Sequence, residues 1–398
     1  MGRYRWVVLG AGVTAQSAYS ALGTGVAVLV PDLRSEYGLS LGQIGLLLAA
    51  ASGGMVLTLI AWGLLTDRVG ERVVVALGLG VAGLAFLAAS TLPPYAVVFA
   101  LLTLAGMAGA SVSAASGRAV MGWFAADERG FALGIRQTAV PLGWAIAALA
   151  LPPIVHAGGL SAGLAALGIG CLGGAMVGVL LLRDPPRFAD AGLDPGRPLS
   201  DRRLWRLSAG STFYVGVQIA LTSFVVVYLH DERGFSLAEA AAVLAVISIL
   251  GGALRILLGR LSDRLATRVI PLRAVGVVLA AAVALTAALS DAPDAVLVPV
   301  LVAAGAISCA WNGLSFTAAA ELAGRGKAGA ALGFQQTALA VGSAVAPPPF
   351  AWLVSATSWT AGFAALAALP LLGVWTLGPL ARDEIPAPAS EPAPGYYK

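Results

Sequence analysis

Charged residues are scarce in this chain of 398 residues, and that scarcity limits what the protein can be. Asp, Glu, Lys and Arg make up 11% of the sequence, whereas soluble domains carry about 25%, and hydrophobic residues make up 59%. So little charge cannot cover the surface of two or three soluble domains. The two cysteines cannot form a disulfide scaffold, and the two histidines are not spaced as metal ligands. The mean hydropathy of +0.87 instead predicts a polytopic membrane protein.

Apolar runs of about 20 residues, the length that crosses a bilayer as a helix, recur twelve times along the chain. Turn-forming residues separate them, for example Thr66-Asp67-Arg68 and Pro93-Pro94. We therefore expect an all-α membrane protein with twelve transmembrane helices. The runs begin near Trp6, Leu41, Val73, Ala96, Arg129, Gly159, Leu204, Ser236, Val269, Ala295, Ala328 and Ser358.

The basic residues predict the orientation of these helices, because cytoplasmic connections are enriched in Lys and Arg. Most of the 24 basic residues lie at the termini or in even-numbered connections, so both termini are expected on the cytoplasmic side of the cell membrane. They form no basic face of the kind that binds nucleic acid. We divide the chain into an N-terminal six-helix half, a cytoplasmic linker, a C-terminal six-helix half and a disordered cytoplasmic tail, at residues 1–183, 184–203, 204–382 and 383–398.

The two halves of the chain resemble each other, as internal repeats do. Each matching segment occupies the same position within its half, which predicts two six-helix repeats in parallel orientation. Parallel repeats of this kind place a substrate site between the halves near the membrane midplane. The matching segments are Gly38-Leu-Ser-Leu41 with Gly234-Phe-Ser-Leu237, Gly63-Leu-Leu-Thr-Asp67-Arg68 with Gly259-Arg-Leu-Ser-Asp263-Arg264, and Leu133-Gly-Ile-Arg-Gln137-Thr138 with Leu332-Gly-Phe-Gln-Gln336-Thr337.

The pattern Gly-x-x-x-Asp-Arg-x-Gly-x-Arg, between the second and third runs, resembles the signature loop of the major facilitator superfamily. It extends from Gly63 to Arg72 and recurs in weaker form from Gly259 to Arg268. The resemblance covers essentially the whole chain, and it implies a transporter that works by alternating access as its two halves rock. It also implies that charged residues of these loops latch one conformation, with Arg72 placed to pair with Asp127 or Glu128. The expected latch residues are Gly63, Asp67, Arg68, Gly70, Arg72, Asp127, Glu128, Asp263, Arg264, Arg268 and Glu321.

Three arginines, Arg118, Arg136 and Arg255, lie inside the apolar runs, where a lipid-facing arginine costs about 2.5–3.5 kcal/mol. No acidic residue is placed in the middle of a run. We therefore expect the three guanidinium groups to face a wet cavity of positive potential that attracts anions. A guanidinium suits this role because its planar fork binds a carboxylate with two hydrogen bonds. Alternatively, Arg118 and Arg136 reach the cytoplasmic boundary, where Arg136 could pair with Glu128.

The stretch from Arg255 to Arg264 also resembles the eighth span of monocarboxylate and oxalate/formate-type carriers. In those carriers an Arg one turn before the Gly contacts the substrate carboxylate. This chain lacks the acid that precedes that Arg in the first group and the Lys of the eleventh span in the second, so the resemblance does not identify the anion. Polar residues at helical spacing complete the expected substrate site, with contact between helices as the alternative role: Gln16, Tyr19, Tyr214, Gln218, Trp311, Asn312 and Gln336.

These features predict a secondary transporter, not an enzyme, that moves a small organic anion, first of all a carboxylate, without a cofactor and as a monomer. Uniport, exchange, and symport with a proton carried on the substrate all remain open. One alternative is a carrier or exporter of neutral or amphipathic solutes or drugs, in which the arginines act as conformational latches. A membrane sensor is a further alternative, although the linker and the tail are too short for a soluble output domain.

Overall fold

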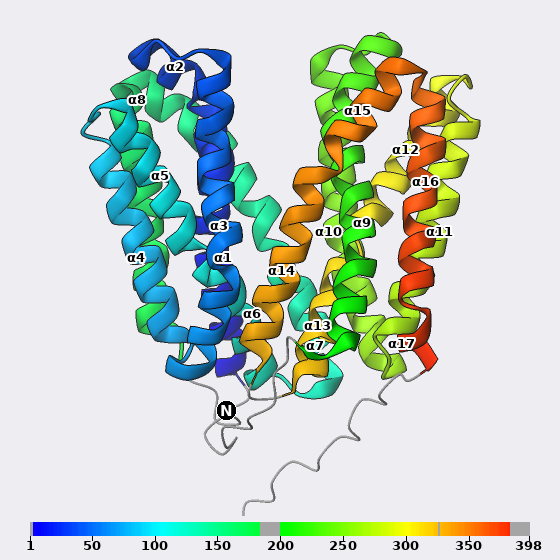
Figure 1. The fold of residues 1–398 in the computed structure, drawn as a ribbon, viewed down its shortest axis with the longest axis horizontal. Coiled ribbons are helices and arrows are strands. Elements are labelled where there is room, and N and C mark those ends of the chain that lie inside the picture. Colours follow the sequence, from blue (N-terminus) through cyan, green and yellow to red (C-terminus); the bar gives the residue numbers. More distant parts are fainter. Residues whose placement is uncertain (1–2, 184–199, 325–326, 383–398) are drawn as a thin grey trace, which may run out of the picture. The chain divides into compact units, whose positions relative to one another are not determined.

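The computed structural model describes residues 3–183, 200–324 and 327–382, which form helices joined by short turns (Figure 1). The predicted linker falls mostly, and the predicted tail wholly, outside these residues. The helices of the first half are α1 (Tyr4–Val28), α2 (Val30–Tyr37), α3 (Leu41–Val69), α4 (Glu71–Ala89), α5 (Tyr95–Gly109), α6 (Ser111–Trp123), η1 (Ala126–Glu128), α7 (Arg129–Gln137) and α8 (Ala139–Leu181).

The second half repeats this order of long and broken helices. Its helices are α9 (Arg202–Val227), η4 (Tyr228–Glu232), α10 (Leu237–Leu265), α11 (Val269–Ala288), α12 (Asp294–Ser308), α13 (Asn312–Ala323), α14 (Ala328–Val345), α15 (Pro347–Ala356), α16 (Trp359–Thr376) and α17 (Gly378–Arg382).

Within the described part of the chain, ten helical stretches are long and apolar enough to cross a membrane, or eleven if the bent pair α1 and α2 is one span. One of the ten, Ala126–Leu181, contains the 43-residue α8, whose backbone leaves helical geometry at Gly159 with φ 68°. Glycine adopts positive φ without steric penalty. Two helices therefore meet at Gly159, where a span was predicted to begin, and counting them separately brings the number to the predicted twelve.

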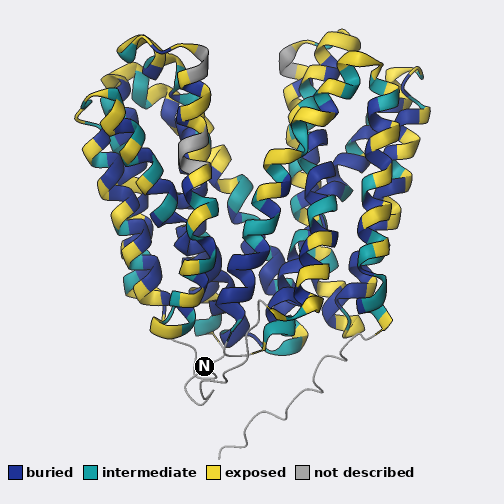
Figure 2. Cartoon of the chain, in the orientation of Figure 1, coloured by how far each residue is buried: buried dark blue, intermediate teal, exposed yellow. Residues whose placement is uncertain are grey.

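Many large apolar side chains of these helices are exposed. Leu57, Leu149 and Trp375 are 77%, 78% and 79% exposed, and exposed positions alternate with buried ones along α4 and α11 (Figure 2). Lipid tails solvate exposed apolar side chains, whereas in water so many of them would favour aggregation. The exposure pattern agrees with the membrane location predicted from composition.

The chain folds into two compact units, which do not coincide with the two halves of the sequence. Unit 1 comprises Met1–Phe124, Arg136–Pro198 and Ala323–Thr337, and unit 2 comprises Ala125–Ile135, Leu199–Leu322 and Ala338–Lys398. Each half thus contributes one short segment to the unit built mainly from the other. The segment Ala125–Ile135 brings η1 and most of α7 into unit 2, and the segment Ala323–Thr337 brings the start of α14 into unit 1.

The repeated Gly-x-Ser-Leu motif has a structural explanation in the starts of α3 and α10. Ser40 and Gln43 form a capping box at the first helix, and Ser236 and Glu239 form one at the second. In such a box each side chain binds the other residue's backbone N–H, which satisfies two donors that the helix leaves free. Gly38 has φ 61° and Gly234 has φ 72°, so the chain turns in the left-handed region before each helix.

Candidate functional site

Arg136, at the end of α7, is an embedded arginine whose guanidinium binds several acceptors. Its side chain belongs to unit 1 and the residue is only 2% exposed. The guanidinium donates from Nη2 to Gln16 Oε1 at 2.9 Å and to the Ser113 carbonyl at 2.6 Å, from Nε to Ser116 Oγ at 3.0 Å, and from Nη1 to Gln137 Oε1. All four of these acceptors are neutral. They hold the guanidinium in one orientation.

Gln16 is itself held in place on α1. Its Nε2 donates to Ser20 Oγ at 3.3 Å, one turn further along the helix. This bond directs the amide oxygen rather than the amide nitrogen toward Arg136. The predicted polar stripe of α1 therefore contacts the predicted arginine, which brings two of the predicted substrate residues together.

Arg118, on α6, has a different electrostatic setting, which corrects the prediction for this residue. Its Nη1 lies 2.6 Å from Glu71 Oε1, and its Nε lies 2.9 Å from Asp67 Oδ1. Glu71 is fully buried at the start of α4. The prediction that no carboxylate offsets the embedded arginines was thus wrong here, because α3 and α4 direct two acidic side chains back toward α6. These ion pairs favour the alternative in which Arg118 is a conformational latch.

Asp67, at the end of α3, binds a helix start from the other half of the sequence. It accepts hydrogen bonds from the backbone N–H groups of Gly329, at 3.0 Å, and Ala330, at 2.9 Å, in the first turn of α14 within unit 1. The first N–H groups of a helix lack partners within it, and the helix dipole there favours negative charge. Gly63 packs against the backbone of Gly329, so the two helices touch closely enough for these bonds to form.

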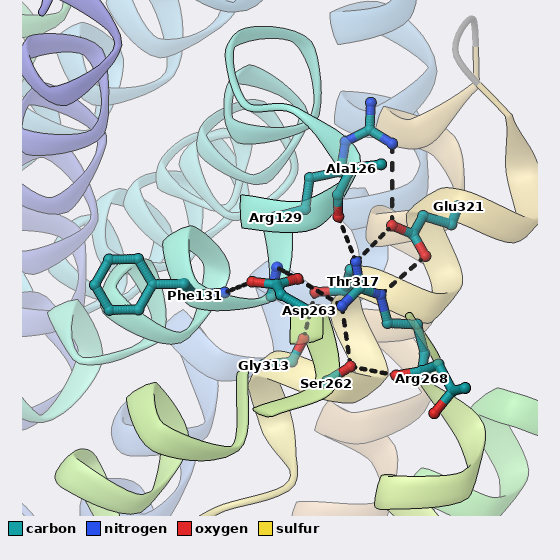
Figure 3. Close-up of polar contacts among 11 residues, drawn as sticks. Ala126, Arg129, Phe131, Ser262, Asp263, Arg268, Gly313, Thr317 and Glu321 are labelled. Atoms are coloured by element: carbon teal, nitrogen blue, oxygen red, sulfur yellow. Dashed lines mark hydrogen bonds and ion pairs between the residues drawn. The ribbon is translucent and has the colours of Figure 1, made fainter. Parts of the chain in front are cut away.

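Unit 2 contains the reciprocal arrangement around Asp263, at the end of α10 (Figure 3). Asp263 accepts from the N–H groups of Gly130, at 2.9 Å, and Phe131, at 2.8 Å, in the first turn of α7. Gly259 packs against the backbone of Gly130, as Gly63 does against Gly329. The internal repeat is therefore a repeat of contacts as well as of sequence, since each half's signature loop caps a helix contributed by the other half.

Arg268 joins Asp263 and Glu321 into one network within unit 2 (Figure 3). Its Nη1 lies 2.6 Å from Asp263 Oδ1, its Nε lies 3.1 Å from Glu321 Oε2, and its Nη2 donates to the Ala126 carbonyl at 2.7 Å. Arg129 Nη1 approaches Glu321 at 3.9 Å. Burial opposes the charge of Arg268, but the carboxylates of Glu321 and Asp263 outweigh it and raise the pKa of the guanidinium above its usual value. Arg268 is charged at any working pH.

Arg255, on α10 in unit 2, is 7% exposed. Its Nε donates to the carbonyl of Cys309, a neutral acceptor at the break between α12 and α13. The backbone carbonyl of Arg255 faces Gly134 of α7, and a Cβ at position 134 would lie 2.8 Å from the Arg255 carbonyl oxygen. Arg255 thus resembles Arg136 in having a neutral hydrogen-bond acceptor, and the two lie in different units.

A model of the Major Facilitator Superfamily matches residues 12–347 of the chain. The protein belongs to the major facilitator superfamily. It is therefore a secondary transporter rather than an enzyme, and a multi-pass protein of the cell membrane. These findings confirm the predicted family.

Individual superfamily members extend the comparison. The chain is 36% identical over 386 residues to the Uncharacterized MFS-type transporter Rv2994 of Mycobacterium tuberculosis, which covers 94% of this chain and 86% of that protein. It is 27% identical over 360 residues to the Probable sulfoacetate transporter SauU of Cupriavidus necator, which covers 83% of each. The solved proton:xylose symporter XylE superposes with a TM-score of 0.76 at 16% identity, over 95% of this chain and 96% of that one. This likeness confirms the predicted all-helical fold.

Several predicted latch residues of this superfamily member lie on the surface. Arg68, Arg264 and Asp127 are exposed. Arg72 is exposed too, at the start of α4, while its neighbour Glu71 points inward to Arg118. The pairing of Arg72 with Asp127 or Glu128, which belong to unit 2, stays a prediction.

Gly70 separates α3 from α4 with φ 83° and ψ 166°. Residues other than glycine adopt this backbone conformation only with strain. We expect Gly70→Ala to lower the free energy of unfolding by about 1–3 kcal/mol, measured by thermal unfolding of the detergent-purified transporter. Gly80→Ala is the matched control, because Gly80 lies inside α4 with open space where the Cβ would be. Equal stability of the two variants would show that the backbone at Gly70 is not strained.

The remaining predicted substrate residues differ in what they contact. The Tyr19 ring packs on Gly109 of α5, and the Tyr214 ring packs on Gly373 of α16. Both contacts favour the alternative role, packing between helices. Trp311 is fully buried with its ring edge-on to Tyr214 at 6.1 Å.

Three half-buried amides remain predicted substrate contacts. The side-chain oxygens of Gln218 and Asn312 have no hydrogen-bond partner among the described residues. Gln336 lies in the part of α14 that belongs to unit 1. The sequence alone could not distinguish these amides from the residues that pack between helices. Helical spacing shows which residues share a face of a helix, but not whether that face contacts another helix or the substrate.

Proposed function

We propose that this transporter moves small organic anions that carry a carboxylate or a similar oxyanion, and that Arg136 binds the anionic group. The observation that carries the proposal is the set of neutral acceptors around the buried Arg136 guanidinium. Neutral oxygens of this kind bind a guanidinium in the way that the oxygens of a carboxylate do, and charged acceptors bind it more strongly, whereas Arg118 is already bound by two carboxylates. We propose that an anionic substrate takes the place of these neutral oxygens during transport.

The relative SauU supports this assignment, because it is named as a probable transporter of sulfoacetate, which is an anion. Sulfoacetate carries a carboxylate and a sulfonate on a two-carbon skeleton. Both groups present oxygens that a planar guanidinium can bind in pairs. We propose Arg255 as an anion contact within unit 2 on the same chemical grounds, since its Nε donates to a neutral carbonyl.

We propose that the two signature loops act as latches in the transport cycle. Asp67 and Asp263 each hold a helix start from the other half of the sequence through two backbone hydrogen bonds. Alternating access by rocking of the halves requires these bonds to break and re-form. Arg118 and Arg268 compensate the aspartates, so the carboxylates remain in place when the helix starts leave.

Binding and uptake by the purified full chain test the proposed substrate class. The transporter is reconstituted in liposomes and assayed for uptake of labelled sulfoacetate, with acetate, succinate, xylose and tetraphenylphosphonium as competitors at matched ionic strength. We expect organic anions to compete and the neutral and cationic compounds not to compete. A charged hydrogen bond contributes about 1.5–3 kcal/mol, so Arg136→Gln should weaken anion binding by about 10- to 150-fold.

Arg206→Gln is the matched control, because it removes an exposed arginine of α9 that has no role in the proposal. Competition only by neutral or lipophilic compounds would overturn the proposal and favour the alternative carrier, in which the arginines are latches. Retained anion affinity in a folded Arg136→Gln variant would remove that residue from the site. Uptake driven by an imposed proton gradient, compared with uptake driven by internal anion, separates symport from exchange.

A further inference from the structure

We propose that the uncharged amide at Gln16 determines the charge selectivity of the transporter. This inference rests on the proposed function, because it concerns the acceptors that an anion would replace at Arg136. Gln16 Oε1 lies 2.9 Å from Arg136 Nη2, and the Gln16 side chain is buried and fixed by its bond to Ser20. The position is therefore already built to place an oxygen against the guanidinium.

Glutamate has almost the same shape as glutamine, so a carboxylate could occupy this position without rearrangement. The bond from Arg136 to Gln16 has an ionised donor but a neutral acceptor, and a carboxylate in place of the amide would add the attraction between two full charges in a buried setting. A carboxylate on α1 would therefore form a buried ion pair with Arg136. An anion arriving from solution would then have to displace a permanently tethered competitor.

Arg118 shows within the same unit what an internal carboxylate does to a buried arginine. Glu71 and Asp67 lie 2.6 and 2.9 Å from its guanidinium and offset its charge. Arg118 and Arg136 are both buried in unit 1. Two carboxylates bind Arg118, whereas two amides, a hydroxyl and a carbonyl are among the groups that bind Arg136.

Gln137 provides a second amide of the same kind. Its Oε1 accepts from Arg136 Nη1, and the residue is buried. The two amides come from different helices, α1 and α7, so they approach the guanidinium independently. Two oxygens of a substrate oxyanion can accept hydrogen bonds as these two amide oxygens do. We infer that the substrate oxygens replace the amide oxygens on Nη1 and Nη2 of Arg136.

The experiment compares Gln16→Glu with the unsubstituted transporter in the sulfoacetate assay. We expect sulfoacetate affinity to fall by at least about 30-fold, corresponding to roughly 2 kcal/mol, while the unfolding temperature of the unliganded protein does not fall. Gln16→Ala removes the amide without adding charge, and the loss in Gln16→Glu should exceed the loss in Gln16→Ala at least tenfold. Gln137→Glu should reproduce the loss, and it keeps the test decisive if Gln16→Glu does not fold.

Gln43→Glu is the control for the change in charge. Gln43 is exposed in the capping box of α3, and its counterpart in the second half is already Glu239. We expect this variant to bind sulfoacetate as the unsubstituted transporter does. Undiminished sulfoacetate binding by folded Gln16→Glu and Gln137→Glu would overturn the inference and leave the proposed function standing. Failure of the unsubstituted transporter to bind any organic anion would instead overturn the proposed function.

Discussion

Replacement of Arg268 by glutamine is expected to lower the free energy of unfolding by about 3–5 kcal/mol, the usual cost of removing one partner from a buried ion pair. Arg268 is 6% exposed and is the shared partner of Asp263 and Glu321. Without it, the buried Asp263 and the partly buried Glu321 lose the cation that they share. Thermal unfolding of the purified transporter in detergent measures the loss.

Arg264→Gln is the control for this prediction, because Arg264 is an exposed arginine of the same signature loop. Its replacement should change the free energy of unfolding by no more than about 0.5 kcal/mol. A loss in Arg268→Gln as small as the loss in Arg264→Gln would show that the carboxylates find other compensation. It would also remove Arg268 from the proposed latch.

Replacement of Gly63 by valine is expected to abolish transport. A Cβ at this position would lie 2.8 Å from the Gly329 carbonyl carbon and 3.0 Å from the Ala330 Cα. These are backbone atoms, which cannot move aside as a flexible side chain can. The start of α14 would be pushed away from α3, and Asp67 would lose both amide hydrogen bonds.

Hydrogen exchange gives a readout of this change that needs no knowledge of the substrate. The amides of Gly329 and Ala330 should lose protection in Gly63→Val, while uptake falls to the background of empty liposomes. Gly53→Val is the matched control on α3, because Gly53 is exposed with open space where the Cβ would be. Normal protection and uptake in Gly63→Val would show that the close contact of the helices is not required.

Much of the fold follows from the sequence because the membrane simplifies the problem. Every backbone group must be satisfied within a helix, so the lengths of the apolar runs give the spans directly. The break at Gly159 and the helix starts after Ser40 and Ser236 coincide with residues that end or cap helices. The internal repeat then predicts the order of the helices in both halves.

The partners of the charged residues were less predictable. Glu71 and Arg72 are neighbours in sequence, yet the first is buried against Arg118 and the second is exposed. The rotation of α4 decides which of the two faces inward, and no pattern in the signature loop gives that rotation. The bond from Arg136 to Gln16 likewise joins residues 120 positions apart, a contact that helical spacing alone cannot reveal.

The exchange of short segments between the halves has a consequence for how the protein is made. The carboxylate of Asp67 is synthesised early, but the Gly329 and Ala330 amides that it binds emerge only after more than 260 further residues have been translated. The first half must therefore wait in the membrane with part of its structure missing. Newly inserted chains should remain sensitive to protease until the eleventh predicted span has entered the bilayer.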